Sequence, residues 1–110
     1  MPFDERLRSA GTDRLFEAMM TLQTCEEYYQ FFEDLCTIGE IQTMAARFRA
    51  AEMLHAGATY EEIVAETGMS SATISRIKRF LRYGADGYLL AIERLQDRPG
   101  TDDPDPDSLL

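Results

Sequence analysis

The sequence predicts an all-α protein built from six helices. Three T-x-x-E spacings, at Thr24, Thr37 and Thr59, indicate helix starts, because the two side chains of such a capping box each bind a backbone N–H that the helix leaves unpaired. Apolar residues recur at spacings of three and four, and no segment alternates with a period of two, so no sheet is expected. The length of 110 residues and the 45% hydrophobic content fit one globular domain.

The N-terminal half is expected to contain three helices after a flexible arm over residues 1–12. The first helix, from about residue 13 to 22, carries apolar residues at helical spacing: Leu15, Phe16, Met19, Met20 and Leu22. The second follows Thr24 and places on one side Tyr28, Phe31, Phe32 and Leu35. The third and longest follows Thr37 and is expected to end at Gly57, since glycine is common just past a helix C-terminus.

Residues 59–83 have the pattern of a helix-turn-helix. The short helix that follows Thr59 ends at Gly68, where glycine allows the positive φ of a sharp turn. Ser70 or Ser71 is expected to cap the second helix. The buried side of that helix is expected to hold Ile74, Ile77 and Leu81. A sixth helix is predicted after it from the apolar residues Tyr88, Leu89, Ile92 and Leu95, so the helical domain spans 13–96.

Positive charge is concentrated in the same motif. The chain as a whole has a net charge of −9, which argues against a protein that coats nucleic acid through bulk attraction. Residues 70–83, however, contain no Asp or Glu and carry the cations Arg76, Lys78, Arg79 and Arg82. Acids farther away than about 8 Å are largely screened at physiological salt. A local basic face on this acidic protein is therefore expected to bind phosphates.

The outer face of the second motif helix, residues 71–82, is expected to read double-stranded DNA. Small residues near the helix start let it enter a major groove, and arginines bind guanine edges or phosphates. The candidates for base contacts are Ser71, Ala72, Ser75 and Arg76, with Arg79 assigned to a base or a phosphate. Lys78 and Arg82 are assigned to the DNA backbone. The alternatives are a structural helical hairpin and a protein-interaction module with a degenerate helix-turn-helix.

The sequence gives little support to other classes of function. It shows no phosphate-cradling loop, no metal-ligand cluster and no nucleophile beside a base, so we expect no enzyme, no catalytic residue and no metal. No apolar run approaches the ~20 residues that cross a membrane, and the N-terminus lacks a signal-peptide core, so a cytoplasmic protein is expected. Prolines and acids over residues 97–110 predict a disordered acidic tail.

The N-terminal helices carry apolar residues on more than one side. Tyr28 and Tyr29 are adjacent in sequence, as are Phe31 and Phe32. A helix that is apolar on two sides needs two partners, and a second subunit can supply one of them. We therefore expect a homodimer with interleaved N-terminal helices, whose two reading helices would lie about 34 Å apart on a palindromic site. Coverage of both sides within the monomer is the alternative.

The segment 72–76, Ala-Thr-Ile-Ser-Arg, follows a long helix that bears Arg47 and precedes a terminal helix, and in this it resembles the Trp repressor. Over residues 13–96 the chain more closely resembles the Trp-repressor-related proteins of YerC/YecD type, including the order of six helices. The resemblance implies an intertwined homodimer whose shared core is formed by the N-terminal helices and the last helix, with the helix-turn-helix as a peripheral reading head. It also implies a bacterial transcriptional regulator that acts as a repressor.

The resemblance also implies a position for a ligand. In the Trp repressor, tryptophan lies between two arginines, and Arg47 and Arg76 occupy these positions, while Thr73 matches a pocket-lining residue. The family pattern then has a glycine that makes room for the indole ring, where this chain has Ile77. We therefore predict that tryptophan is not the co-repressor, and we expect no cofactor. Binding of another small effector molecule is the alternative. The backbone carbonyls that hold the amino group of the ligand come, in the family, from the positions of Asp34 and Cys36.

Overall fold

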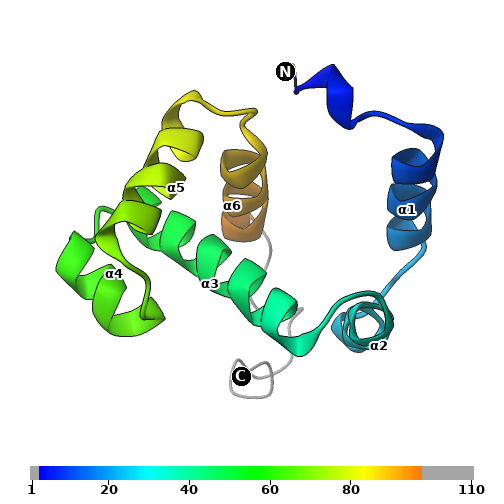
Figure 1. The fold of residues 1–110 in the computed structure, drawn as a ribbon, viewed down its shortest axis with the longest axis horizontal. Coiled ribbons are helices and arrows are strands. Elements are labelled where there is room, and N and C mark those ends of the chain that lie inside the picture. Colours follow the sequence, from blue (N-terminus) through cyan, green and yellow to red (C-terminus); the bar gives the residue numbers. More distant parts are fainter. Residues whose placement is uncertain (1–2, 98–110) are drawn as a thin grey trace.

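A computed structural model describes residues 3–97 of the chain. Within this range lie six α-helices, one short 3-10 helix and no strand, which confirms the predicted class (Figure 1). The 3-10 helix spans Glu5–Leu7, and the α-helices are α1 (Ala10–Met20), α2 (Cys25–Leu35), α3 (Ile38–His55), α4 (Tyr60–Thr67), α5 (Ser71–Tyr83) and α6 (Gly87–Asp97). The acidic tail predicted over residues 97–110 lies, apart from Asp97, outside the described residues.

Side-chain caps determine where the middle helices begin. Thr24, Thr37 and Thr59 each accept a hydrogen bond from the backbone N–H three residues later. At α3 and α4 the box is complete, because Glu40 and Glu62 accept from the backbone N–H of the capping threonine, both at 2.8 Å. The three helix starts predicted from the T-x-x-E spacing are therefore confirmed.

The first helix begins at Ala10, earlier than the start near residue 13 that the apolar spacing indicated. Ser9 is its cap and accepts a hydrogen bond from the N–H of Thr12 at 3.0 Å. This cap precedes Leu15, the first residue of the apolar pattern, so the pattern did not reveal it. Helical structure therefore extends into the segment 1–12 that the sequence assigned to an arm, which also contains the 3-10 turn at Glu5–Leu7.

The hydrophobic core lies among the four C-terminal helices. Helix α3 packs against α4, α5 and α6, and α5 also packs against α4 and α6 (Figure 1). All the buried hydrophobic residues of the described range belong to these helices: Ala50, Ala51, Ile63, Ile74, Ile77 and Ile92. The two helices of the predicted motif, α4 and α5, are thus held in place by α3, and α5 also by α6.

Helices α1 and α2 stand apart from this core and connect to it through the start of α3 (Figure 1). Neither of them contains a buried residue, and on α1 the side chains of Phe16 and Met20 are 53% and 76% exposed. The radius of gyration, 15.2 Å, exceeds the ~13 Å typical of a compact domain of this length. A single chain therefore leaves apolar residues of α1 uncovered.

Candidate nucleic-acid interface

A glycine turn and a serine cap fix the start of α5. Gly68 ends α4 with φ 74°, in the left-handed region that glycine adopts without steric cost, and its N–H donates to the carbonyl of Val64 at 2.9 Å. Ser70 then accepts from the backbone N–H of Thr73 at 3.2 Å. Ser70 is therefore the cap of α5, and Ser71 is its first residue.

Helix α5 has one buried side and one exposed side. Ile74 and Ile77 are 0% and 3% exposed, and Leu81 packs against the same core. Six of the predicted DNA-binding residues are exposed: Ser71, Ala72, Ser75, Arg76, Arg79 and Arg82. Lys78 is half-buried. The division of the helix that its apolar spacing predicted is confirmed, and the outer side chains are accessible to a partner.

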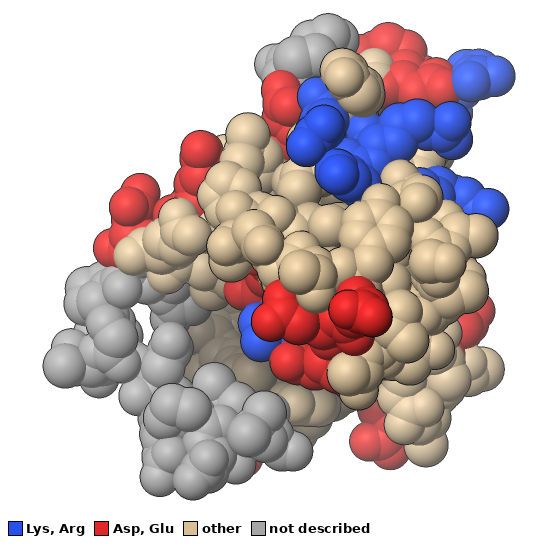
Figure 2. Space-filling model, turned by 90° about the vertical axis from the view of Figure 1, so that its left-hand side faces the viewer, with Lys and Arg blue, Asp and Glu red and all other residues tan. Residues whose placement is uncertain are grey.

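The basic side chains of α5 have no acidic partner within residues 3–97. The ion pairs of this range involve arginines of other elements, and none of them includes Arg76, Lys78, Arg79 or Arg82. Figure 2 shows Lys and Arg side chains gathered on one part of the surface, with one group of Asp and Glu below them and other acidic side chains beside their upper edge. Within residues 3–97, the cations of α5 are therefore not held in ion pairs and can bind a partner.

Tyr60, the first residue of α4, contacts two of the predicted DNA-binding residues. Its hydroxyl lies 3.1 Å from the Oγ of Ser75, and the Nζ of Lys78 lies 5.8 Å from the centroid of its ring, within cation–π range. The half-buried ring also packs against the core. The sequence pattern did not single out Tyr60, although its position three residues before the buried Ile63 places it on the inner side of α4.

An ion pair connects the first motif helix to α3. The guanidinium Nε of Arg49 donates to a carboxylate oxygen of Glu66 on α4, and its Nη1 lies 3.7 Å from Glu52. The hydrogen bond to Glu66 is the main reason that the pKa of Arg49 is raised above its ordinary value. Because both side chains are about half exposed, solvent screening leaves such a pair a small effect on stability, within about 1 kcal/mol.

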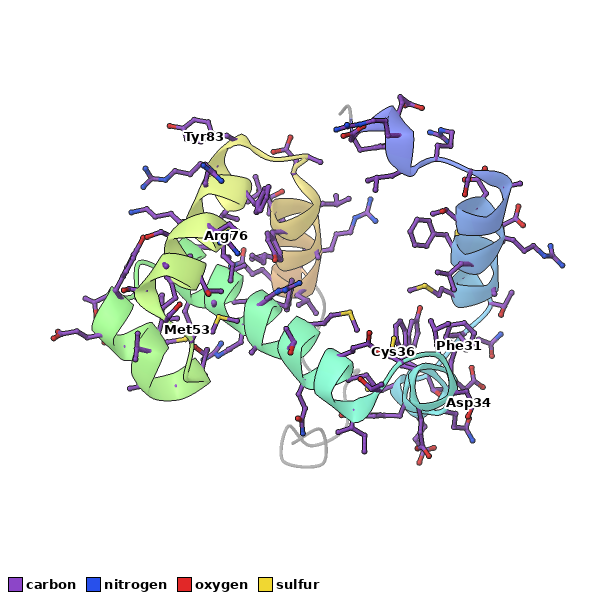
Figure 3. The ribbon with its side chains drawn as sticks, in the orientation of Figure 1. Phe31, Asp34, Cys36, Met53, Arg76 and Tyr83 are labelled. Atoms are coloured by element: carbon purple, nitrogen blue, oxygen red, sulfur yellow. The ribbon has the colours of Figure 1, made fainter. Side chains whose placement is uncertain are left out.

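Two positions of the implied ligand pocket, Asp34 and Cys36, lie away from Arg76 within one chain. Ile77 packs into the core, as predicted for the buried side of α5. The hydroxyl of Thr73 lies 3.0 Å from that of Ser70, and Arg47 is exposed on α3. Figure 3 places Asp34 and Cys36 near α2, on the other side of the molecule from Arg76. Within a single chain, Asp34 and Cys36 therefore do not contribute to a site beside Arg76.

The described part of the chain was also compared with the features of metal sites, membrane-spanning helices and small-molecule pockets. No group of three or more His, Cys, Asp or Glu residues in this part is placed to hold a metal ion. None of its helices is both long enough and apolar enough to cross a bilayer.

An open, mostly apolar hollow of about 360 Å³ lies where α5 meets α6, lined by Phe80, Ala85, Gly87 and Tyr88.

A small all-α domain that presents a basic second helix in a helix-turn-helix defines a class of candidate DNA-binding proteins. Within that class, this chain belongs to the Trp repressor family, because the family model described as Trp repressor protein matches residues 10–96. The uncharacterized protein YerC of Bacillus subtilis (strain 168) is 50% identical over 93 residues, which cover 84% of this chain and 89% of YerC.

Two crystal structures show a similar fold. A TrpR-like protein from Eubacterium eligens ATCC 27750 matches with a TM-score of 0.82 and 44% identity, over 87% of this chain and 99% of that one. A candidate Trp repressor from Staphylococcus aureus matches with a TM-score of 0.80 and 47% identity, over 87% of this chain and 96% of that one. Family membership supports DNA binding and transcription regulation as the general class of function.

Proposed function

We propose that this protein is a bacterial repressor that recognises a specific duplex sequence by placing α5 in the major groove. The observation that carries the proposal is the division of α5: Ile74 and Ile77 hold one side in the core, while the opposite side presents arginines without acidic partners in the described range. A helix held in this way presents cations and small side chains on one rigid face. Such a face suits the phosphates and base edges of DNA.

The position of each side chain along α5 supports a role in the complex. Ser71, Ala72, Ser75 and Arg76 lie in the first two turns, where recognition helices approach base edges. The guanidinium of Arg76 can form two parallel hydrogen bonds with O6 and N7 of guanine, so Arg76 is the main candidate for base reading. Arg79 reaches either a base or a phosphate. Lys78 and Arg82 contact phosphates and set the register of the helix.

The proposal includes a homodimer. On α1 and α2, Phe16, Met20 and Leu35 are each about half exposed or more, which leaves apolar surface that a second copy would cover. A two-fold dimer would also present two α5 helices to successive major grooves, with half-sites about 10 base pairs apart. We therefore propose that the functional unit is the dimer and that its target is an inverted repeat.

The proposal is tested by selecting duplexes from a random pool with the purified full-length protein. We expect enrichment of an inverted repeat, and we expect Arg79→Ala to weaken the recovery of this repeat. Arg14→Ala is the matched control, because Arg14 on α1 is also exposed and arginine is likewise replaced by alanine. Selection of no sequence, together with a complex of defined mass with a different protein, would contradict the proposal and favour the interaction-module alternative.

A further inference from the structure

The contact between Tyr60 and Ser75 joins the two helices of the motif at the proposed reading face. The two hydroxyl oxygens are 3.1 Å apart, and either atom is able to donate. The phenol is the more restrained of the two groups, because its ring packs against the core and lies under the Nζ of Lys78. Ser75, in contrast, is exposed on α5. The position of the serine hydroxyl is therefore governed by a tyrosine that belongs to the other helix.

We propose that Tyr60 is a positioning residue that determines which base Ser75 prefers. In the complex the phenol O–H donates to the Oγ of Ser75, and the O–H of Ser75 then donates to an acceptor on a base edge. A serine by itself pairs with donors and acceptors alike, because a hydroxyl has both capacities. A hydrogen bond received from a fixed donor polarises the serine O–H and makes it a stronger donor.

The acceptors that this arrangement selects in the major groove are purine N7, guanine O6 and thymine O4. Ser75 would therefore favour these acceptors over the cytosine and adenine amino groups at one base pair of each half-site. This inference rests on the proposed function and adds to it the chemical identity of one recognised group. The phenol itself touches no base in this arrangement, so it acts only through Ser75.

The test compares the base-preference profiles of the wild-type protein, Tyr60→Phe, Ser75→Ala and the double variant. Tyr60→Phe keeps the ring, its core packing and the Lys78 contact, and removes only the hydroxyl. We expect it to reduce the preference at one base pair per half-site roughly three- to tenfold, the range of one ordinary hydrogen bond. Ser75→Ala should affect the same base pair, and the double variant should lose no more than Ser75→Ala alone.

Three results would overturn the inference: an unchanged profile in Tyr60→Phe, an equal loss at every position, or additive losses in the double variant. Thermal melts and salt titrations of the four proteins provide the control, since a merely structural role would lower the melting temperature without shifting preference at a single base pair. If the wild-type protein selects no sequence, the proposed function itself fails. If it selects a sequence whose profile does not depend on the Tyr60 hydroxyl, only the present inference fails.

Discussion

Arg76 and Ile77 are neighbours in α5, yet the helix places them in different environments. Arg76 is exposed and forms no ion pair with the described residues, whereas Ile77 is 3% exposed within the core. The apolar spacing of α5 was sufficient to predict this difference, because a helix turns by about 100° per residue. The contact of Ser75 and Lys78 with Tyr60 was not predictable in the same way, since it depends on how α4 packs against α5.

Replacing Arg76 by alanine tests base reading directly. We expect the change to weaken binding to the selected duplex by about 1–3 kcal/mol, the value of a good bidentate contact with guanine, and to relax the preference at that base pair. Equilibrium binding to the selected duplex and to random duplex provides the comparison. Equal losses on both duplexes would show that Arg76 does not read a base.

Lys78 is expected to behave differently, because its proposed contact is a phosphate. Lys78→Ala should weaken binding to selected and random duplexes alike and should lower the slope of log affinity against log salt by about 1. Lys78 is half-buried, and its Nζ lies 5.8 Å from the centroid of the Tyr60 ring. A salt titration in which the variant keeps the wild-type slope would rule out the phosphate contact.

Ile77 leads to a prediction about small ligands. Its side chain fills the position where the family pattern has glycine, and it is buried against the core rather than turned away from it. We therefore expect no micromolar binding of tryptophan in isothermal titration calorimetry, and the same affinity for DNA with and without tryptophan. Saturable heats at micromolar tryptophan would contradict this prediction.

At the scale of the helices, local hydrogen bonding explains most of what the sequence revealed. The boxes at Thr37 and Thr59 are sequence-local, so the starts of α3 and α4 could be read directly. The start of α1 depends on Ser9, which lies outside the apolar pattern and was therefore missed. The ion pair between Arg49 and Glu66 joins residues seventeen positions apart and has no local signature.

The turn between α4 and α5 can be tested by changing Gly68. Gly68 has φ 74°, a region that costs an alanine roughly 1–2 kcal/mol, so Gly68→Ala should lower the free energy of unfolding by about that amount. Gly68→Asn is the matched control, because asparagine tolerates the left-handed region better than alanine does. Urea denaturation measures both variants. An alanine variant as stable as the wild-type protein, or less affected than the asparagine variant, would contradict the expectation.

At the scale of the whole molecule, the sequence predicted the helix order but not the open arrangement of one chain. The adjacent aromatic pairs of α2 indicated more apolar surface than one neighbour would cover. That expectation left open whether the monomer or a partner covers it. The described chain has no buried residue in α1 or α2. This is the physical reason for proposing a second copy, and it arises from tertiary packing that helical periodicity does not encode.

The proposed dimer predicts a mass in solution of twice 12.5 kDa. Met20→Asp should shift sedimentation equilibrium toward the monomer and weaken binding to the inverted repeat, because Met20 is 76% exposed on the uncovered side of α1 and a charge opposes apolar contact. Arg14→Asp serves as the control, since Arg14 is exposed on the same helix and already polar. A wild-type protein that sediments as a monomer at all concentrations would exclude the dimer.

Methylation interference on the selected duplex tests the central claim most directly, because guanine N7 lies in the major groove and adenine N3 in the minor groove. If α5 reads the major groove, N7 methylation should block binding at guanines in both half-sites, and Arg76→Ala should lose this sensitivity at one guanine per half-site. Binding that is insensitive to N7 methylation, or an Arg76→Ala pattern identical to that of the wild-type protein, would contradict the account.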